Sequence, residues 1–317
     1  MRVLFIDNTH PILPELLTKN GFQVDYLTDL PKEQYYKLIP DYEGIIIRSK
    51  ISIDKKVLDS ARKLRFIGRV GAGMDSIDVN YAAAKGVLCL NSPEGNRDAV
   101  GEHTLGMLLN LMNNINTADR QVRQGKWMRE ANRGEEIKGK TIGIIGYGNM
   151  GSAFAERLQG FGASIIAYDK YKTGFSTQIV KEVQMLEIFE TSDILSLHVP
   201  LTKETTYMFD DKYINNFHKQ FRLLNTSRGM LVNTEDLVKA LVNGKVKGAA
   251  LDVIEYEDTS FEFFSPEKQT EAMKYLIASE KVLLTPHIAG WSQESQVKLA
   301  SILADKILSE FTGLNNI

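Results

Sequence analysis

Short apolar runs alternate with amphipathic stretches through the first ninety or so residues of the chain. The apolar runs predict strands at Arg2–Ile6, Gln23–Leu27, Gly44–Ile47, Phe66–Val70 and Val87–Leu90. Apolar residues at helical spacing predict helices between them, at Pro14–Lys19, Lys55–Lys63 and Asn80–Lys85. Repeated strand–helix alternation is typical of a parallel sheet with helices on both faces. This region has no glycine-rich phosphate turn, so it need not bind a cofactor.

A second series of elements begins with a longer helical pattern. This pattern runs from about Asp98 to Arg123, and its apolar residues recur at intervals of three and four, at Leu105, Leu108, Leu109, Met112 and Ile115. Apolar runs then predict strands at Thr141–Ile145, Ile194–Val199, Arg222–Asn225, Ala249–Val253 and Val282–Thr285. An amphipathic helix is expected at Gln293–Phe311. The second series therefore predicts another doubly wound unit.

The segment Thr141–Asp169 carries the most specific motif of the chain. Its first apolar run meets Gly146-x-Gly148-x-x-Gly151, a helical pattern follows, and a second apolar run ends the segment. This is the order of a dinucleotide-binding βαβ unit. Gly146 permits the tight turn, Gly148 lets the backbone approach a pyrophosphate, and Gly151 lets helix and strand pack closely.

Two further features of this unit bear on the cofactor. Asn149 and Met150 lie between the second and third glycines, before the predicted helix, whose N-terminal N–H groups and positive dipole end favour phosphates. Asp169 lies 23 positions after the first glycine (169 − 146), near the distance at which a carboxylate accepts bonds from the ribose hydroxyls. A carboxylate there repels a 2′-phosphate, so NAD is favoured over NADP, and Lys170 and Lys172 would soften that preference.

Together the two series predict an α/β protein with two doubly wound parallel-sheet domains, a flavodoxin-like substrate domain and a Rossmann NAD-binding domain. Pro93 and Gly95 break structure within Ser92–Asn96, which places a boundary there. Because the cofactor unit lies in mid-chain, we expect the C-terminal helix to complete the first domain. The substrate domain would then comprise residues 1–94 and 290–317, and the NAD-binding domain residues 95–289. Chain crossings near 95 and 290 would form a hinge, with the active cleft between the domains.

Composition narrows the class of protein. A length of 317 residues suggests about two domains, and 43% hydrophobic with 25% charged residues is ordinary for a soluble globular protein. The formal net charge is −2 (38 − 40). The chain therefore has no overall positive charge that would indicate a nucleic acid partner. The single cysteine, Cys89, excludes an internal disulfide framework and suits a reducing cytoplasm. The N-terminal apolar run is typical of a strand rather than a signal peptide. No apolar run approaches the ~20 residues that span a bilayer. The spacing of the histidines does not indicate a metal site.

Two polar residues follow predicted strands at the edge where open α/β sheets bind ligands. Arg228, in LLNTSRG, can hold a carboxylate bidentately and polarise an adjacent carbonyl; the alternative is a surface ion pair. His287, in LLTPHIAG, is placed for proton transfer near neutral pH; the alternative is a structural histidine bonded to backbone. The remaining histidines are interpreted mainly as structural or cofactor-neighbouring: His10, His103, His198 and His218.

Two further segments carry groups with a chemical use. The acidic stretch LDVIEYED contains Asp252, Glu255 and Glu257, and a carboxylate bonded to an imidazole fixes its tautomer. Acidic loop residues are usually just solvated, and the residues alone do not choose between the two glutamates. In RVGAGMDSID, the consecutive amides of residues 71–73 would form an anion-binding nest or a plain strand-to-helix turn.

Taken together, these residues resemble the D-isomer-specific 2-hydroxyacid dehydrogenase family. The resemblance covers essentially the whole chain. It rests on Arg48-Ser49, RVGAGMDSID, GEHTLGMLLNL, GKW, GIIGYGNMGS, HVPLT, NTSRG, AALDV and TPHIAG, in the family's order. Such a series of blocks is far more specific than a single glycine motif.

The resemblance implies a role for each matched residue. Arg228 would bind the substrate carboxylate and carbonyl oxygen, His287 would be the acid/base, and Glu257, five positions after Asp252, would pair with the histidine. Asp252 would contact the nicotinamide carboxamide. The substrate carboxylate would lie in a cradle of amides from Val70, Gly71, Ala72 and Gly73. Further cofactor contacts are expected from the HVP and NTS blocks, at His198, Val199, Pro200, Thr226 and Ser227.

This chain departs from the family pattern in one place. The family usually has proline directly after that glutamate, whereas Asp258 follows here and the loop is longer. The choice of Glu257 over Glu255 therefore rests on the spacing from Asp252 and not on a following proline. The extra aromatic residues of this loop, Phe261, Phe263 and Phe264, would shape a pocket or a subunit contact.

Among family members the chain is most similar to the dehydrogenases of 3-phosphoglycerate, through RSK, RVGAGMDSIDV, NSPEGN and GKW. A phosphorylated substrate needs a cation at a distance from Arg228, and Arg48 and Lys50 are the candidates, with Arg69 a weaker one. Ordinary surface charge is the alternative for these residues. Only 30 residues (317 − 287) follow His287, so no serine-sensing regulatory domain is expected.

Two other functions stay open. The first is a glyoxylate/hydroxypyruvate reductase with the same catalytic residues and an unphosphorylated substrate. The second, a dinucleotide-sensing corepressor, is not an enzyme, and the presence of the whole Arg/Glu/His set argues against it. The resemblance also implies a homodimer, for which the helix Asp98–Arg123 is the natural contact.

Overall fold

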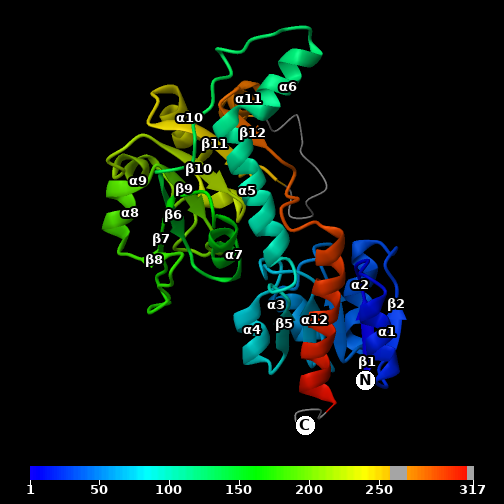
Figure 1. The fold of residues 1–317 in the computed structure, drawn as a ribbon. Coiled ribbons are helices and arrows are strands. Elements are labelled where there is room, and N and C mark those ends of the chain that lie inside the picture. Colours follow the sequence, from blue (N-terminus) through cyan, green and yellow to red (C-terminus); the bar gives the residue numbers. More distant parts are fainter. Residues whose placement is uncertain (258–269, 313–317) are drawn as a thin grey trace. The chain divides into compact units, whose positions relative to one another are not determined.

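The computed structural model describes residues 1–257 and 270–312, which form two compact units (Figure 1). The first unit holds residues 1–97 and 291–312, and the second holds residues 98–257 and 270–290. The chain passes from the first unit to the second after Arg97, and the turn before Arg97 is packed within the first unit. The amide of Ser92 donates to the carbonyl of Gly71 at 3.0 Å, and a Cβ at Gly95 would lie 2.6 Å from the backbone nitrogen of Leu299. The aromatic residues Phe261, Phe263 and Phe264 lie outside the described residues.

The first unit is built on a five-stranded parallel sheet in the order β2-β1-β3-β4-β5. Its strands are β1 (Arg2–Phe5), β2 (Gln23–Tyr26), β3 (Gly44–Ile47), β4 (Phe66–Arg69) and β5 (Leu88–Asn91). Its helices are α1 (Ile12–Lys19), α2 (Lys32–Leu38), η1 (Ile39–Asp41), α3 (Lys55–Ser60), α4 (Val79–Ala84) and α12 (Gln293–Phe311). Val3 and Phe5 pack with α1 and α12, while Leu4 packs with the residues of α2 and α3. Burial on both faces explains why β1 and β3 are almost entirely apolar.

The second unit has a seven-stranded parallel sheet in the order β12-β11-β10-β9-β6-β7-β8. Its strands are β6 (Thr141–Ile145), β7 (Ser164–Tyr168), β8 (Lys181–Glu182), β9 (Ile194–Leu197), β10 (Phe221–Asn225), β11 (Val246–Leu251) and β12 (Val282–Leu284). Its helices are α5 (Arg97–Asn113), α6 (Ile115–Arg123), α7 (Asn149–Arg157), α8 (Met185–Thr191), α9 (Asp211–Asn215), η2 (Gly229–Leu231), α10 (Thr234–Val242) and α11 (Glu271–Ala278). The strand order reverses between β6 and β9, where dinucleotides bind in folds of this order. The prediction of two doubly wound parallel-sheet units, flavodoxin-like and Rossmann, is confirmed.

The single long helix predicted from Asp98 to Arg123 is wrong in one respect, because the chain forms two helices. Asn114 adopts a left-handed conformation, with φ 54°, and interrupts the helix. Asparagine tolerates that conformation better than most residues. The side chain of Asn110 accepts a hydrogen bond from the amide of Asn116 at 3.0 Å, which starts the next helix in a new direction. Apolar spacing alone does not reveal such a break.

Helix α12 spans the range predicted from its amphipathic pattern. Ser292 and Ser295 form a reciprocal cap at its N-terminus, and Leu299, Leu303 and Ile307 are buried against the sheet of the first unit. Within the described part of the chain, no helix is both long enough and apolar enough to cross a membrane.

Candidate functional site

The glycine-rich turn after β6 has the close approaches that the motif requires. Gly146 has φ 91°, and a Cβ there would lie 2.5 Å from the carbonyl oxygen of His198. A Cβ at Gly151 would lie 2.0 Å from the carbonyl oxygen of Gly146. At Gly148, by contrast, a Cβ would meet nothing within 4 Å. Gly148 also precedes α7 without a side-chain cap, so the turn has open space and helix N–H groups that fit a diphosphate.

Asp169 follows β7, and three backbone amides donate hydrogen bonds to its carboxylate and fix its position. Its carboxylate accepts from Tyr147 at 2.8 Å, from Tyr171 at 2.9 Å and from Lys172 at 3.0 Å. The ammonium of Lys170 forms an ion pair with Glu204. This position therefore presents a fixed carboxylate, which fits the ribose hydroxyls of NAD.

The HVP and NTS blocks contact each other beside the glycine turn. The hydroxyl of Ser227 donates to the carbonyl of Val199. His198 lies with Nε2 2.8 Å from the hydroxyl of Ser196, and burial lowers the pKa of His198 to about 4. A neutral imidazole at this place adds no charge near the glycine turn at neutral pH. The carbonyl of Pro200 accepts from Thr205 at 2.7 Å, which closes the loop after β9.

Arg228 lies in a tight turn after β10 that one side chain organises. Asn225 accepts from the amide of Ser227 at 3.1 Å and donates to the carbonyl of Arg228 at 2.9 Å. A Cβ at Gly229 would lie 2.0 Å from the carbonyl of Ile254, so the two loops after β10 and β11 pass at backbone contact. The glycine thereby brings the Arg228 loop beside the acidic loop that contains Glu257.

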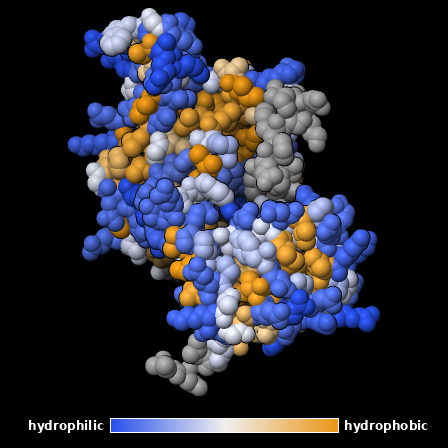
Figure 2. All heavy atoms as spheres, turned by 90° about the vertical axis from the view of Figure 1, so that its right-hand side faces the viewer, coloured by the Kyte–Doolittle hydropathy of each residue, from blue (hydrophilic) through white to orange (hydrophobic). Residues whose placement is uncertain are grey.

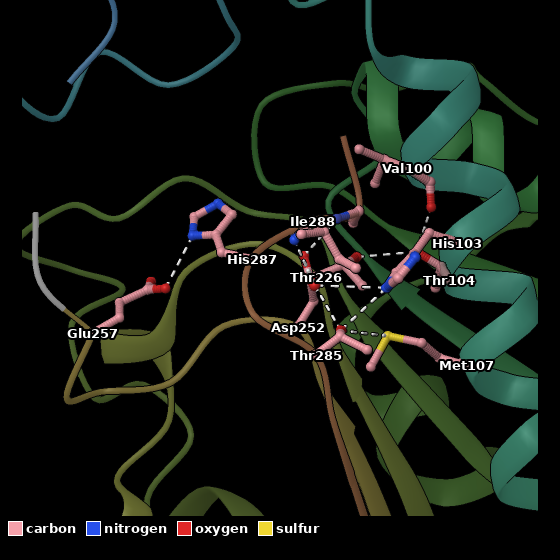
Figure 3. A network of polar contacts seen from close by, with 11 residues as sticks. Val100, His103, Thr104, Met107, Thr226, Asp252, Glu257, Thr285, His287 and Ile288 are labelled. Carbon is pink, nitrogen blue, oxygen red and sulfur yellow. Dashed lines mark hydrogen bonds and ion pairs between the residues drawn. The ribbon is translucent and has the colours of Figure 1, made fainter. Parts of the chain in front are cut away.

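The two glutamates of the acidic loop have different surroundings. Oε2 of Glu257 lies 2.9 Å from Nδ1 of His287, and both side chains are about one-fifth exposed (Figure 3). Glu255 accepts from the hydroxyl of Tyr207 at 2.8 Å and from the amide of Thr234, at the N-terminus of α10, at 3.1 Å. Glu257 therefore faces the imidazole, and Glu255 joins the loop to a helix end. Such a histidine–carboxylate pair can exchange a proton through the other ring nitrogen.

His287 lies in a turn that Asp252 holds (Figure 3). The three consecutive amides of His287, Ile288 and Ala289 all donate to Asp252, the first to its backbone carbonyl and the others to its carboxylate, at 2.8, 2.9 and 2.8 Å. His287 itself has φ 55°, a left-handed conformation that costs a non-glycine residue roughly 1–2 kcal/mol. Burial alone would raise the pKa of Asp252, but the bonds from His103, Thr285 and these amides hold the pKa below its usual range.

The candidate substrate cations lie in the first unit, after β3. The guanidinium of Arg48 lies 4.2 Å from the ring centre of Trp291, and its backbone amide donates to the buried carboxylate of Asp7 at 2.6 Å. Burial lowers the pKa of Arg48, which the nearby Asp7 opposes. Lys50 donates from its ammonium to the carbonyl of Thr28. Arg48 therefore presents a planar cation fixed against an aromatic face, whereas Lys50 is bonded to a neighbouring loop.

The glycine-rich segment after β4 is also in the first unit. The amide of Val70 donates to the carbonyl of Ile47 at 2.9 Å, as part of the sheet, so the hypothesis of an anion cradle rests on the amides of Gly71, Ala72 and Gly73. The guanidinium of Arg69 fills the space where a side chain at Gly71 would be, with Nη1 1.5 Å from that Cβ position. Glycine at 71 thus makes room for Arg69.

Sequence reasoning missed several supporting residues: Asn225, Thr285, Thr104 and the part that His103 plays beside Asp252. Asn225 had a local signal, since an amide side chain at a strand end often organises the following turn. The others lie on elements far apart in the sequence and had none. Among residues 1–257 and 270–312, no group of three or more His, Cys, Asp or Glu side chains is arranged to hold a metal ion.

Comparisons with known proteins add to this geometry. Residues 105–289 match the family described as "D-isomer specific 2-hydroxyacid dehydrogenase, NAD binding domain". The chain is 34% identical over 316 residues to a D-3-phosphoglycerate dehydrogenase of Archaeoglobus fulgidus, covering 99% of this chain and 58% of that protein. It is 34% identical over 281 residues to a hydroxypyruvate reductase of Thermotoga maritima, covering 89% of each. The chain thus spans little more than half the length of the phosphoglycerate dehydrogenases that it matches.

A solved structure has the same fold over nearly the full length. A D-lactate dehydrogenase from Aquifex aeolicus, complexed with NAD and lactic acid, superposes with a TM-score of 0.84 at 26% identity, covering 99% of this chain and 96% of the other.

Proposed function

Because the chain belongs to the D-isomer specific 2-hydroxyacid dehydrogenase family, we propose that it transfers a hydride between NAD and C2 of a D-2-hydroxy acid. The observation that carries this proposal is the His287–Glu257 pair, which lies on a turn anchored by Asp252 in the NAD-binding unit. A paired histidine of this kind is the usual acid/base where a hydroxyl must lose its proton as a carbonyl forms.

NAD would be held by residues of the second unit. The turn at Gly146, Gly148 and Gly151 offers space and helix N–H groups for the diphosphate, and Asp169 offers a carboxylate for the ribose. The resemblance assigns Asp252 to the carboxamide, but its side chain is 0% exposed and accepts from the amides of Ile288 and Ala289, so we propose that Asp252 acts through this turn. When bound, NAD accepts or donates the hydride at nicotinamide C4.

The residues of this chain supply the proton and the charge stabilisation. In oxidation, His287 takes the proton of the C2 hydroxyl while the C2–H bond breaks with both electrons leaving as hydride, so the alcohol becomes a carbonyl. Glu257 stabilises the imidazolium that forms, since its carboxylate lies against Nδ1. Arg228 binds the substrate carboxylate and stabilises charge on the reacting oxygen. In reduction each role is reversed.

The substrate proposed is 3-phosphoglycerate, with 3-phosphohydroxypyruvate as its oxidised form. Support comes from Arg48, whose guanidinium is fixed against Trp291 at the carboxyl end of β3, and from the relatives named for this substrate. Hydroxypyruvate reduction is the second candidate, because the Thermotoga maritima relative bears that name and matches over most of its own length. The two substrates differ only in the phosphate, so a cationic side chain that binds the phosphate would make the enzyme prefer the phosphorylated one.

NADH consumption with 3-phosphohydroxypyruvate and with hydroxypyruvate, measured side by side, tests this proposal. A kcat/KM at least about tenfold higher for the phosphorylated substrate, or about 1.4 kcal/mol of transition-state preference, supports a phosphate site. An equal or higher value for hydroxypyruvate removes the phosphoglycerate assignment and leaves a general 2-keto acid reductase. NADH binding without turnover on any 2-keto acid would favour a dinucleotide-sensing binding protein instead.

A homodimer is proposed as the assembly. Support comes from exposed apolar side chains on and after α6: Ile115, Val122, Trp127 and Met128. Trp127 is 79% exposed, which is costly for so large a ring unless a partner covers it. Figure 2 shows further hydrophobic surface below the mainly hydrophilic uppermost part of the view. Light scattering after size-exclusion chromatography tests the proposal, and a monomer at micromolar concentration would contradict it.

A further inference from the structure

Side chains from α5 and from the loops after β11 and β12 form a continuous polar network (Figure 3). Nε2 of His103 lies 3.1 Å from Oγ1 of Thr285 and 3.5 Å from Oδ1 of Asp252. Oγ1 of Thr285 lies 2.6 Å from the same carboxylate oxygen. The side chain of Asp252 is 0% exposed, so these contacts replace water around a buried charge.

The carboxylate of Asp252 is almost fully used by the protein. Oδ1 accepts from Thr285 and from the amide of Ile288, and Oδ2 accepts from the amide of Ala289. The backbone carbonyl of Asp252 accepts from His287. Movement of this carboxylate would therefore release the amides that enforce the left-handed turn at His287.

Hydrogen counting assigns the tautomer of His103. The hydroxyl of Thr285 has one hydrogen. It donates this hydrogen to the Asp252 carboxylate, which is charged and closer, rather than to the sulfur of Met107 at 3.9 Å. Toward His103, the threonine oxygen can then only accept. Nε2 of His103 must carry a hydrogen, which also points its partial positive charge toward Asp252.

The residue next to His103 ties the same helix to a second loop. The hydroxyl of Thr104 donates to the carbonyl of Val100 at 2.7 Å, so the 3.1 Å contact with Thr226 uses the hydrogen of Thr226. Adjacent residues of α5 thus hold the loop after β10 and the loop after β12. The helix is a common support for the two loops that contain Arg228 and His287.

We propose that His103 is a positioning residue whose Nε2–H, with the hydroxyl of Thr285, fixes the Asp252 carboxylate and through it the backbone turn that aims His287. This role rests on the proposed dehydrogenase function, because it concerns the acid/base of that reaction. His103 does not need to contact substrate to act in this way.

Kinetics of paired variants give the first test. His103→Ala is expected to lower kcat by roughly tenfold or more, with KM changed by less than about threefold, because the proton-transfer geometry is lost while the substrate contacts remain. His103→Gln retains an N–H donor at similar reach and is expected to recover most of kcat. His218→Ala, at an exposed histidine of the same unit, is the matched control. Equal losses of kcat in the Ala and Gln variants would overturn the proposal, because the packing of the imidazole ring and not its N–H donor would then matter.

A second test needs no turnover and so separates this proposal from the proposed function. NMR of protein labelled at the ring nitrogens of its five histidines reports each tautomer. His103 is expected with its hydrogen on Nε2, and Thr285→Val is expected to shift the signals of His287, whereas Thr285→Ser is not. A hydrogen on Nδ1 alone, or an unmoved His287 in Thr285→Val, would refute the positioning role even if the enzyme is active. The Thr285 pair also decides the question if His103→Ala does not fold.

Discussion

Nδ1 of His287 lies 2.9 Å from Oε2 of Glu257, although the two residues are 30 positions apart on loops after different strands. The contact links the left-handed turn after β12 to the loop after β11, which Gly229 brings against the Arg228 turn. The parallel sheet of the second unit therefore gathers the His287–Glu257 pair and the Arg228 loop at the carboxyl ends of its strands, where doubly wound sheets bind ligands.

The first prediction concerns His287. His287→Ala is expected to lower kcat by about a hundredfold to ten-thousandfold, because it removes the proposed general acid/base. NADH binding, followed by fluorescence titration, should stay within about threefold, since the residues proposed for the diphosphate and ribose are untouched. Near-normal turnover in this variant would exclude the assigned role.

The second prediction separates the two glutamates. Glu257→Gln is expected to lower kcat by at least about tenfold, because a neutral amide does not stabilise an imidazolium against Nδ1. Glu255→Gln is its matched control, and it should keep kcat within about threefold while lowering the melting temperature, since Glu255 joins Tyr207 to the N-terminus of α10. If the two variants exchange these effects, the role proposed for Glu257 beside His287 is wrong.

The third prediction uses two glycines of one turn. Gly148 has φ −86° and open space around a Cβ, so Gly148→Ala should fold normally and bind NADH about tenfold more weakly, or about 1.4 kcal/mol, because the methyl group enters the space for the diphosphate. Gly151→Ala should instead destabilise the protein by about 1–3 kcal/mol, because its Cβ meets the carbonyl of Gly146. Thermal unfolding and NADH titration of both variants measure the difference. Unchanged NADH affinity in Gly148→Ala would place the cofactor elsewhere.

Much of the fold could be predicted from the sequence because burial leaves a periodic record. Strands buried on both faces read as apolar runs, and the amphipathic pattern of Gln293–Phe311 gives that helix its bounds. The break at Asn114 leaves no such record, because one left-handed residue redirects the helix without changing apolar spacing.

The site could be predicted in part for a different reason. The glycine turn and Asp169 are local in sequence, so their spacing carries the chemistry. The contact of His103 with Thr285 joins residues 182 positions apart, and only the folded chain brings them together. The choice between Glu255 and Glu257 depends on how the loop turns. Two glutamates two positions apart do not reveal from their sequence alone which of them faces the imidazole.

The fourth prediction is a pH dependence of stability. Hydrogen bonds from Arg222 and Lys247 hold the pKa of Glu135 well below its usual range, partial burial opposes them, and Lys140 adds to the lowering. A depressed carboxyl pKa contributes stability above the unfolded pKa of about 4.3, and this contribution is lost as pH falls through the folded pKa. Glu135→Gln should therefore melt a few degrees below the unsubstituted protein at pH 7.

The gap between these two melting temperatures should narrow steadily as the pH falls below about 4, because both proteins then lack the ionised carboxylate. Glu190→Gln, at an exposed glutamate of the same unit, is the control and should show little difference at either pH. A gap for Glu135→Gln that is independent of pH would mean that the side chain contributes by packing rather than by charge.

The fifth prediction concerns the proposed phosphate contact. The guanidinium of Arg48 is held over the ring of Trp291, so the cation has a fixed position. Arg48→Gln is expected to raise KM for 3-phosphohydroxypyruvate by about tenfold or more while changing KM for hydroxypyruvate by less than about threefold. Arg62→Gln replaces an exposed arginine of the same unit and should change neither value.

Trp291→Leu distinguishes the position of the cation from its charge. Leucine keeps an apolar side chain but removes the aromatic face, so the guanidinium stays charged and loses its fixed orientation. The phosphorylated substrate should then lose affinity by less than in Arg48→Gln, and the double variant should be no worse than Arg48→Gln alone, because tryptophan acts only through the arginine. Additive losses of affinity in the double variant would show that Trp291 contacts the substrate independently. Equal losses of affinity for both substrates would show that neither residue binds the phosphate.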